Sequence, residues 1–202
     1  RHFFPTRRSS DLKRDLPWRK TTDPYRILVS ELMLQQTQVD RVILKYIAFL
    51  KQFPDAKSLA QAPTSEVLKL WSGLGYNRRA INLQKAAQVI ATKGWLEDLD
   101  DLPGVGPYTA AAVTAFAFNK PAPVIDINIR RIYARYLHAG KNVNVDVVAQ
   151  TPRGRACDWN NALMDFGSSI CVANNPVCSQ CPLSKSCAAF KAGNFEYVKP
   201  KP

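Results

Sequence analysis

Four cysteines near the end of the sequence have the spacing of metal ligands. They follow the pattern Cys-x6-Cys-x2-Cys-x5-Cys and are Cys171, Cys178, Cys181 and Cys187. Thiolates held in such short loops can enclose one metal centre, and zinc and a [4Fe–4S] cluster accept four sulfur ligands equally well. Because the cysteines are clustered rather than spread as in a small disulfide-rich domain, the pattern indicates a metal centre in a reducing compartment.

A short segment with alternating glycines joins two stretches of helical pattern, and it reads Leu102-Pro103-Gly104-Val105-Gly106-Pro107. Gly104 and Gly106 permit positive φ and a close approach of another backbone. The N–H groups of such a turn, and of the helix that follows it, suit a phosphate group. An ordinary turn between two helices favours glycine and proline as well, so the pattern alone leaves both interpretations open.

The elements that must position these groups are predicted to be helices. Asp23 and Pro24 form a helix start, because aspartate is a good N-cap and proline fits the first helical position. Gly73 and Gly75 end a later helix. The expected helices cover residues 24–34, 39–53, 64–72, 81–91, 96–101, 108–118, 128–138 and 158–170. No convincing alternation of polar and apolar residues predicts a strand, so the expected fold class is all-α.

Composition places the chain among basic globular proteins. Lys and Arg total 28 against 16 Asp and Glu, which gives a formal net charge of +12. Such a charge favours a polyanionic partner, nucleic acid above all, although solubility alone also accounts for it. No run of about 18 apolar residues predicts a membrane span, and no apolar signal segment is visible. Arg1–Leu12 join no helical pattern and are expected to be a non-native extension.

Several longer motifs make the chain similar to a known family. They are Leu16-Pro17-Trp18-Arg19, Ser30-Glu31-Leu32-Met33-Leu34-Gln35-Gln36-Thr37-Gln38-Val39, Gly73-Leu74-Gly75-Tyr76, Val124-Ile125-Asp126 and Asn161-Ala162-Leu163-Met164-Asp165-Phe166-Gly167. With them the chain resembles the adenine DNA glycosylases of the MutY type, within the helix-hairpin-helix DNA glycosylase superfamily. The resemblance extends over roughly residues 16–187. The run from Glu31 to Val39 is far more specific than the hairpin.

The resemblance implies two helical lobes with a DNA-binding cleft between them. A helix-hairpin-helix six-helix barrel would span residues 24–119, and residues 13–23 plus 120–202 would form an iron–sulfur cluster lobe. The cysteine spacing matches the family's cluster loop, which favours a [4Fe–4S] cluster over zinc. A monovalent cation at the hairpin is a further expectation. No C-terminal domain that recognises 8-oxoguanine is expected after the cluster lobe.

Two acidic residues are the candidate catalytic pair. Removal of a purine needs protonation of the departing base and stabilisation of positive charge at C1′, a problem that glycoside hydrolysis solves with two carboxyl groups. Apolar neighbours such as Leu28 and Leu32 could raise the pKa of Glu31. Without the resemblance, Glu31 would be an exposed helix residue and Asp126 an N-cap. The resemblance implies that Glu31 protonates adenine and that Asp126, with Asn128 close to it, stabilises the C1′ cation.

Tyr108 distinguishes the type of reaction. The related endonuclease III enzymes carry a lysine at this position, and its amine attacks C1′ and leads to strand cleavage. Tyrosine cannot form a Schiff base, so the resemblance implies a monofunctional enzyme that leaves an abasic site. The motif Tyr108-Thr109-Ala110 also occurs in thymine and uracil mismatch glycosylases of the same superfamily.

The remaining implied site residues contact DNA or the extruded base. A base inside a duplex must be flipped out before it can react. Gln36 and Tyr76 would fill the space beside the former partner of the flipped adenine. The base pocket would be lined by Trp18, Arg19 and Leu34, and the DNA backbone would be bound by Gly104, Val105 and Gly106.

Together these features predict a base-excision-repair enzyme that removes adenine mispaired with 8-oxoguanine or guanine. The expected partner is double-stranded DNA with A:8-oxoG or A:G, the expected state is a monomer without membrane contact, and the expected location is the cytoplasm of a bacterium or archaeon. Two alternatives remain at this point. One is a thymine or uracil mismatch glycosylase, and the other is a non-catalytic iron–sulfur module that binds duplex DNA with a steep salt dependence.

Overall fold

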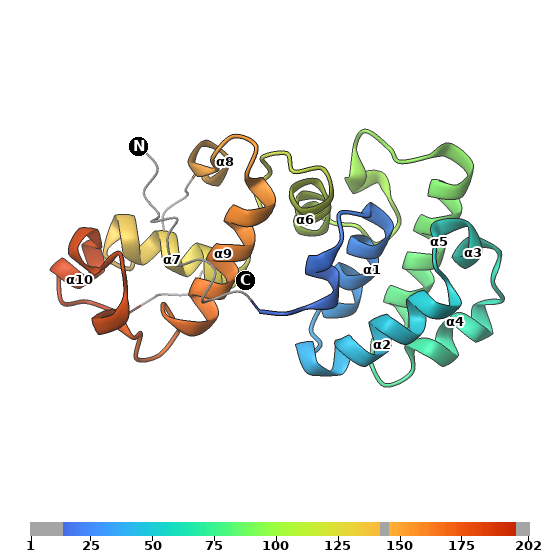
Figure 1. The fold of residues 1–202 in the computed structure, drawn as a ribbon, viewed down its shortest axis with the longest axis horizontal. Coiled ribbons are helices and arrows are strands. Elements are labelled where there is room, and N and C mark those ends of the chain that lie inside the picture. Colours follow the sequence, from blue (N-terminus) through green and yellow to red (C-terminus); the bar gives the residue numbers. More distant parts are fainter. Residues whose placement is uncertain (1–13, 142–145, 197–202) are drawn as a thin grey trace. The chain divides into compact units, whose positions relative to one another are not determined.

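A computed structural model describes residues 14–141 and 146–196 of the chain (Figure 1). The chain divides into two compact units. We call Asp15–Phe118 the hairpin unit, because it contains the turn at residues 102–107, and we call Arg14 with the described residues from Asn119 onward the cysteine unit. The expected extension Arg1–Leu12 lies outside the described residues.

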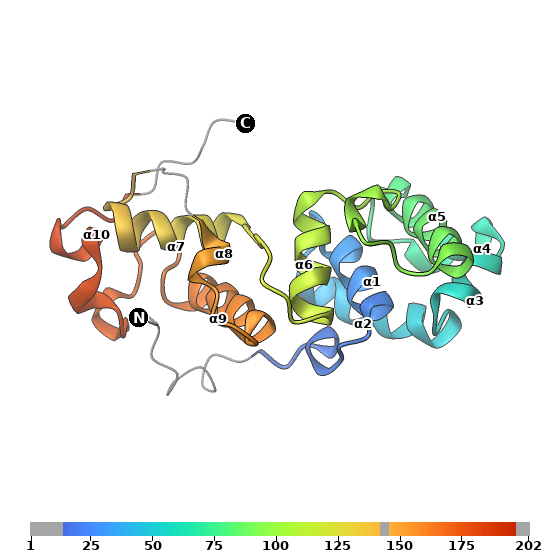
Figure 2. The ribbon, with the colours of Figure 1, turned by 90° about the horizontal axis from the view of Figure 1, so that it is seen from above.

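The hairpin unit is built around helix α1 (Pro24–Leu34). This helix packs against α2 (Val39–Gln52), α5 (Arg78–Lys93) and α6 (Pro107–Ala117), as Figures 1 and 2 show. The shorter elements are the 3₁₀ helices η2 (Pro17–Lys20) and η3 (Leu99–Asp101) and the helices α3 (Ala56–Gln61) and α4 (Thr64–Trp71). Large side chains such as Phe49, Trp71 and Leu83 are fully buried in its core.

Local sequence signals determine where these helices begin and end. The Asp23 side chain caps α1 by accepting a hydrogen bond from the Tyr25 N–H at 2.8 Å. Asp55 and Ser58 form a reciprocal capping box at the start of α3. Helix α5 is followed by its C-cap Gly94, whose φ of +75° is a left-handed conformation that glycine adopts without steric cost. The turn residues of the sequence thus set the lengths of the helices.

The cysteine unit is built around α7 (Ile127–His138), which packs against α9 (Ala156–Ser169) and α10 (Ala188–Lys191) (Figure 2). Its other elements are α8 (Val147–Gln150), η4 (Cys178–Gln180) and η5 (Ser184–Ser186). Its core consists of Ile129, Ile132, Tyr133, Tyr136, Val147, Leu163, Phe166 and Leu183. The segment after α9 contains only short elements, so side-chain contacts rather than long helices hold it in place.

The all-α prediction is confirmed, because the described part of the chain contains helices and no strand. Helix α5 begins at Arg78, three residues earlier than expected, and the helix expected at 96–101 is reduced to η3. Helices α3, α8 and α10 were not predicted, since elements this short give too little periodic signal. In the same described part, no helix combines the length and the apolar character that a membrane crossing requires.

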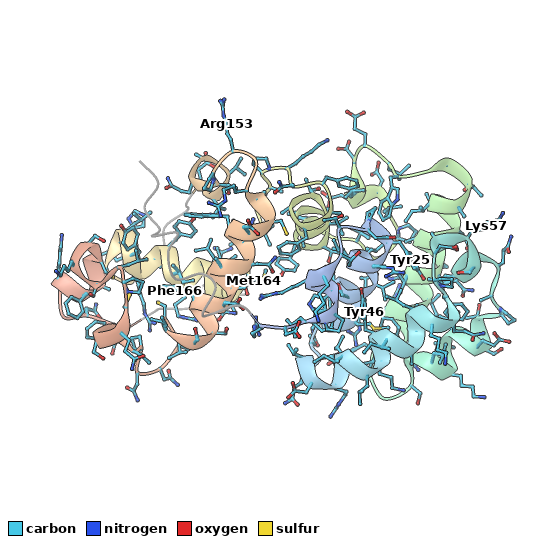
Figure 3. All side chains as sticks on the ribbon, in the orientation of Figure 1. Tyr25, Tyr46, Lys57, Arg153, Met164 and Phe166 are labelled. Atoms are coloured by element: carbon cyan, nitrogen blue, oxygen red, sulfur yellow. The ribbon has the colours of Figure 1, made fainter. Side chains whose placement is uncertain are left out.

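The N-terminal segment differs from the expected division of the chain. The sequence assigns residues 13–23 to the second lobe, but Asp15–Asp23 belong to the hairpin unit. The physical reason is the burial of Trp18, whose ring packs edge-on against the ring of Tyr46. The two ring centres lie 5.4 Å apart. Tyr46 is labelled in Figure 3, on α2. At the other end of the unit, the division between Phe118 and Asn119 lies beside the expected boundary.

Candidate functional site

Glu31 lies on α1 and is buried. Its exposed fraction is 8%, while that of Leu28 and of Leu32 is 1%. Helix α1 buries residues on most of its circumference, because α2, α5 and α6 all pack against it. The structure therefore places one carboxyl group in a helix that otherwise buries mainly apolar side chains.

The three residues predicted to line a base pocket lie in the same unit as Glu31. Trp18 is buried, and Arg19 and Leu34 are half-buried. Leu34 is the last residue of α1 and follows Glu31 by three positions, so the two side chains share one face of the helix. Trp18 also has the core role described above, and its place in a base pocket stays a prediction.

Two turns of the hairpin unit present exposed residues at positive φ. Gln36 has a φ of +55°, and Tyr76, whose exposed fraction is 65%, has a φ of +48°. Left-handed conformations in residues other than glycine cost about 1–3 kcal/mol and persist only where the surrounding structure holds them. The Thr37 hydroxyl donates to the Leu74 carbonyl at 3.3 Å, so the two turns are hydrogen-bonded to each other.

The hairpin turn is fixed against α5. Gly104 has a φ of +77°, and a Cβ there would lie 2.5 Å from the Cβ of Asn82, so only glycine fits. Gly106 has a φ of −99° and is the N-cap of α6, so it does not use the positive φ that glycine permits. The Val105 N–H donates to the Leu102 carbonyl at 3.0 Å within the turn. Binding of a phosphate or of a monovalent cation here stays a prediction.

Tyr108 is the second residue of α6, directly after this turn, and its exposed fraction is 37%. The Gln35 amide donates to the Thr109 hydroxyl at 3.3 Å, which joins α6 to the end of α1. Tyr108 therefore lies in the first turn of a helix that is hydrogen-bonded to the end of α1, the helix that carries Glu31.

Asp126 is the N-cap of α7 in the cysteine unit. Its Oδ1 accepts a hydrogen bond from the Ile129 N–H at 2.6 Å, and its Oδ2 accepts one from the Asn128 amide at 3.0 Å. These bonds hold the carboxylate at the end of the helix that favours negative charge. Ile127 is the first helical residue and has no positive φ. Asp126 is therefore an N-cap, as the sequence indicates, and its side chain also contacts that of Asn128.

Two buried arginines of α7 hold the backbone that leads into the cysteine segment. Arg131 donates to the carbonyls of Gly167 at 2.6 Å and Cys171 at 2.8 Å, and also to the Asn128 side chain at 2.9 Å. Arg135 donates to the Val172 carbonyl at 2.6 Å and to the next carbonyl at 2.7 Å. Its Nη1 lies 3.7 Å from the Cys171 sulfur. A hydrogen-bonded path therefore joins Asp126 to the first cysteine.

All four predicted cysteine ligands line one pocket. Its walls also include Ile132, Arg135 and Phe166, the last of which is labelled in Figure 3. Burial, with smaller effects of the neighbouring thiols, raises the pKa of Cys178, and burial raises the pKa of Cys181 to about 11. Among the described residues, no three His, Cys, Asp or Glu side chains come close enough together to hold a single metal ion.

The site residues are divided between the two units. The hairpin unit contains Glu31, Tyr108, the residues predicted to line the base pocket, the turns that carry Gln36 and Tyr76, and the hairpin turn. The cysteine unit contains Asp126, Asn128 and the four cysteines. The convergence of Glu31 and Asp126 on one bond stays a prediction.

Three arginines were missed by sequence reasoning. Arg79, Arg131 and Arg135 are all less than 10% exposed, although arginine on a helix is usually solvated. A signal was present for two of them, because Arg131 and Arg135 are four residues apart and therefore lie on one face of α7. Arg79 gives no such signal, since it follows another arginine at the start of α5.

A family model described as "HhH-GPD superfamily base excision DNA repair protein" matches residues 29–151, and the chain belongs to this family. It is 41% identical over 196 residues to the adenine DNA glycosylase of Mycobacterium tuberculosis, covering 89% of this chain and 64% of that protein. It is 37% identical over 193 residues to the adenine DNA glycosylase of Buchnera aphidicola, covering 88% of this chain and 54% of that protein. The chain thus spans between half and two thirds of the length of these relatives.

Among solved structures, a thermostable thymine-DNA glycosylase superposes with a TM-score of 0.81 at 34% sequence identity. The match covers 89% of both chains. The helix-hairpin-helix glycosylase fold expected from the sequence is therefore confirmed.

Proposed function

We propose that this chain is a monofunctional DNA glycosylase that flips adenine out of duplex DNA and hydrolyses its N-glycosyl bond where adenine is paired with 8-oxoguanine or guanine. The observation that carries the proposal is the buried carboxyl group of Glu31, in a chain whose curated relatives are named adenine DNA glycosylases. A buried carboxyl group that is protonated can donate its proton to a departing base.

Asp126 is proposed to supply the second carboxyl group. Its side chain is oriented by the Ile129 N–H and by Asn128, so its position is fixed before substrate arrives. A preorganised carboxylate stabilises the positive charge that develops at C1′ when the bond to adenine breaks. Water then completes the hydrolysis and leaves an abasic site.

Tyr108 supports a reaction without strand cleavage. A phenol at the start of α6 cannot form the imine that a lysine amine forms with the opened sugar. We therefore assign no covalent amine chemistry to this position. Trp18, Arg19 and Leu34 are proposed to contact the adenine, and Gln36 and Tyr76 to enter the duplex.

The four cysteines are proposed to hold a [4Fe–4S] cluster. They fit such a group because all four thiols line one pocket whose walls are largely apolar and which includes the Arg135 guanidinium beside Cys171. Four thiolates are the usual ligands of this cluster, and its binding organises a segment with little core of its own. The residues that would hold it are Cys171, Cys178, Cys181 and Cys187.

The test is a panel of synthetic duplexes that contain A:8-oxoG, A:G, G:T or G:U. We expect free adenine from the first two and a strand break only after treatment with hot alkali. Strand cleavage without alkali would contradict the role of Tyr108. Binding to all duplexes without release of any base would contradict the glycosylase assignment and support a non-catalytic DNA-binding module.

A thymine or uracil mismatch glycosylase is the second candidate. The likeness to a thymine-DNA glycosylase at 34% identity favours it, but identity to the adenine enzymes reaches 41%. Release of thymine or uracil in the same panel, without release of adenine, would establish this alternative.

A further inference from the structure

Arg79 is a buried cation that neither the pocket nor the catalytic pair uses. It lies at the start of α5, and its exposed fraction is 9%. Its guanidinium donates to six acceptors, all in the hairpin unit. Five are the backbone carbonyls of Leu32 at 2.8 Å, Met33 at 3.1 Å, Gln35, Leu74 at 3.0 Å and Gly75 at 3.0 Å. The sixth is the side-chain hydroxyl of Thr37 at 3.2 Å.

These acceptors fall into two groups that are far apart in the sequence. Nη1 donates to the carbonyls at the end of α1, which have no partner within the helix. Nη2 donates to the turn that precedes Tyr76 and to Thr37. One planar guanidinium therefore sets the separation of the turn that carries Gln36 and the turn that carries Tyr76.

The aromatic rings around Arg79 strengthen the arrangement. The guanidinium carbon lies 5.5 Å from the ring centre of Trp71 and 5.5 Å from that of Tyr76, within the range of a cation–π interaction. The Trp71 ring is fully buried, whereas the Tyr76 ring is mostly exposed. Arg79 thus connects the rigid core directly to an exposed side chain.

We propose that Arg79 is a positioning residue that holds Gln36 and Tyr76, both at positive φ, as a preformed pair for entry into the duplex. The inference rests on the proposed function, because it assigns a purpose to the rigidity of these two residues. A preformed pair avoids the ordering of two strained turns when DNA binds. Lysine cannot replace Arg79, because an ammonium group has three donors and lacks the planar fork of the guanidinium.

The first test is amide hydrogen exchange of the free protein, which does not depend on catalysis. We expect Arg79→Lys to increase exchange at residues 34–37 and 74–77 together, while exchange in the rest of the hairpin unit stays unchanged. Lys93→Ala removes one positive charge from the exposed end of the same helix and serves as the matched control. Unchanged exchange in either turn of Arg79→Lys would overturn the proposal.

The second test is a double-mutant cycle on the single-turnover release of adenine from an A:8-oxoG duplex. Arg79→Lys should slow the intact protein at least about tenfold, because small misplacements of positioning groups are costly. In a Gln36→Ala/Tyr76→Ala background it should slow release by less than about twofold, since residues that act through one another are not additive. A merely structural role predicts equal losses in both backgrounds and would overturn the proposal.

The two tests separate the inference from the proposed function. If the intact protein releases no base from any duplex of the panel, the proposed function fails, and the exchange measurement still decides whether Arg79 holds the two turns. If exchange increases in both turns but release is unaffected, the turns are held for another purpose and the inference fails alone.

Discussion

The two units share one structural device but differ in their cores. In both units, buried arginines donate to carbonyls at or just after helix ends: Arg79 in the hairpin unit, and Arg131 and Arg135 in the cysteine unit. Of the twelve largest fully buried side chains in the described residues, the hairpin unit contains Trp71, Phe49, Ile27, Leu28, Leu32, Met33, Leu59, Leu83 and Val29, and the cysteine unit only Ile129, Ile132 and Leu163.

The difference shows where each unit obtains its stability. Burial of large apolar side chains stabilises the hairpin unit without any ligand. The segment after α9 has short helices, and its four cysteines line a pocket rather than fill one. We infer that this segment depends on the group its thiols bind, whereas the hairpin unit does not.

The largest expected effect is on catalysis. Glu31→Gln keeps the size and burial of the side chain but removes the proton donor, and we expect adenine release to slow by about 10²–10⁴-fold. Glu66→Gln changes an exposed carboxyl group on α4 and is the matched control. The measurement is single-turnover release with saturating enzyme. If Glu31→Gln released adenine as fast as the control, Glu31 would not be the proton donor.

The next effect separates the stabilities of the two units. Loss of one ligand in Cys181→Ser should weaken the proposed metal centre, and structural metal sites contribute on the order of 10 kcal/mol to folding. Amide exchange should then increase across residues 156–191 while the core of the hairpin unit keeps its protection. Cys157→Ser, outside the pocket, is the control. Equal loosening of both units would contradict the contrast between them.

Core packing should give a smaller but measurable effect. Phe49→Ala removes a fully buried ring from the hairpin unit and should lower the free energy of unfolding by about 3–5 kcal/mol. Phe190→Ala, at a ring that is 43% exposed in the cysteine unit, should change it by less than about 1 kcal/mol. Thermal unfolding of both variants, prepared in the same way, compares them. A larger loss for Phe190→Ala would reverse the assignment of the core.

The smallest effect concerns a helix cap and its dependence on pH. The Ser58 N–H and hydroxyl hold the pKa of Asp55 below its usual value, so the cap stabilises the fold at neutral pH and is lost as the pH falls below about 4. Asp55→Ala should cost about 0.5 kcal/mol at pH 7, because the residue is exposed, and less at pH 3. Denaturant unfolding at both pH values measures this, and a cost that grew at low pH would contradict the sign.

Much of the fold followed from local signals. The Asp23–Pro24 start of α1 and the end of α4 before Gly73 were both predictable, because caps and glycines act over a few residues. The place of Asp15–Asp23 was not, since it depends on the contact between Trp18 and Tyr46, which are far apart in the sequence.

The site was predictable where a residue type alone limits the chemistry. Four cysteines in short loops could be assigned to one pocket from their spacing. The hydrogen bonds of Arg79 could not, because five carbonyl groups, from the end of α1 and from the turn before Tyr76, become its acceptors only after folding. The roles of Gln36 and Tyr76 rested on the resemblance, and the physical reason for their rigidity appears only in the structure.

The central proposal is that Glu31 and Asp126 are the two carboxyl groups of the reaction. The most direct measurement is single-turnover adenine release from an A:8-oxoG duplex by Asp126→Asn. Asparagine is as good an N-cap as aspartate, so α7 and the bond from the Ile129 N–H are preserved while the negative charge is removed. We predict that the variant binds the duplex like the intact protein and releases adenine at least about 10²-fold more slowly. Release at the intact rate would contradict the account.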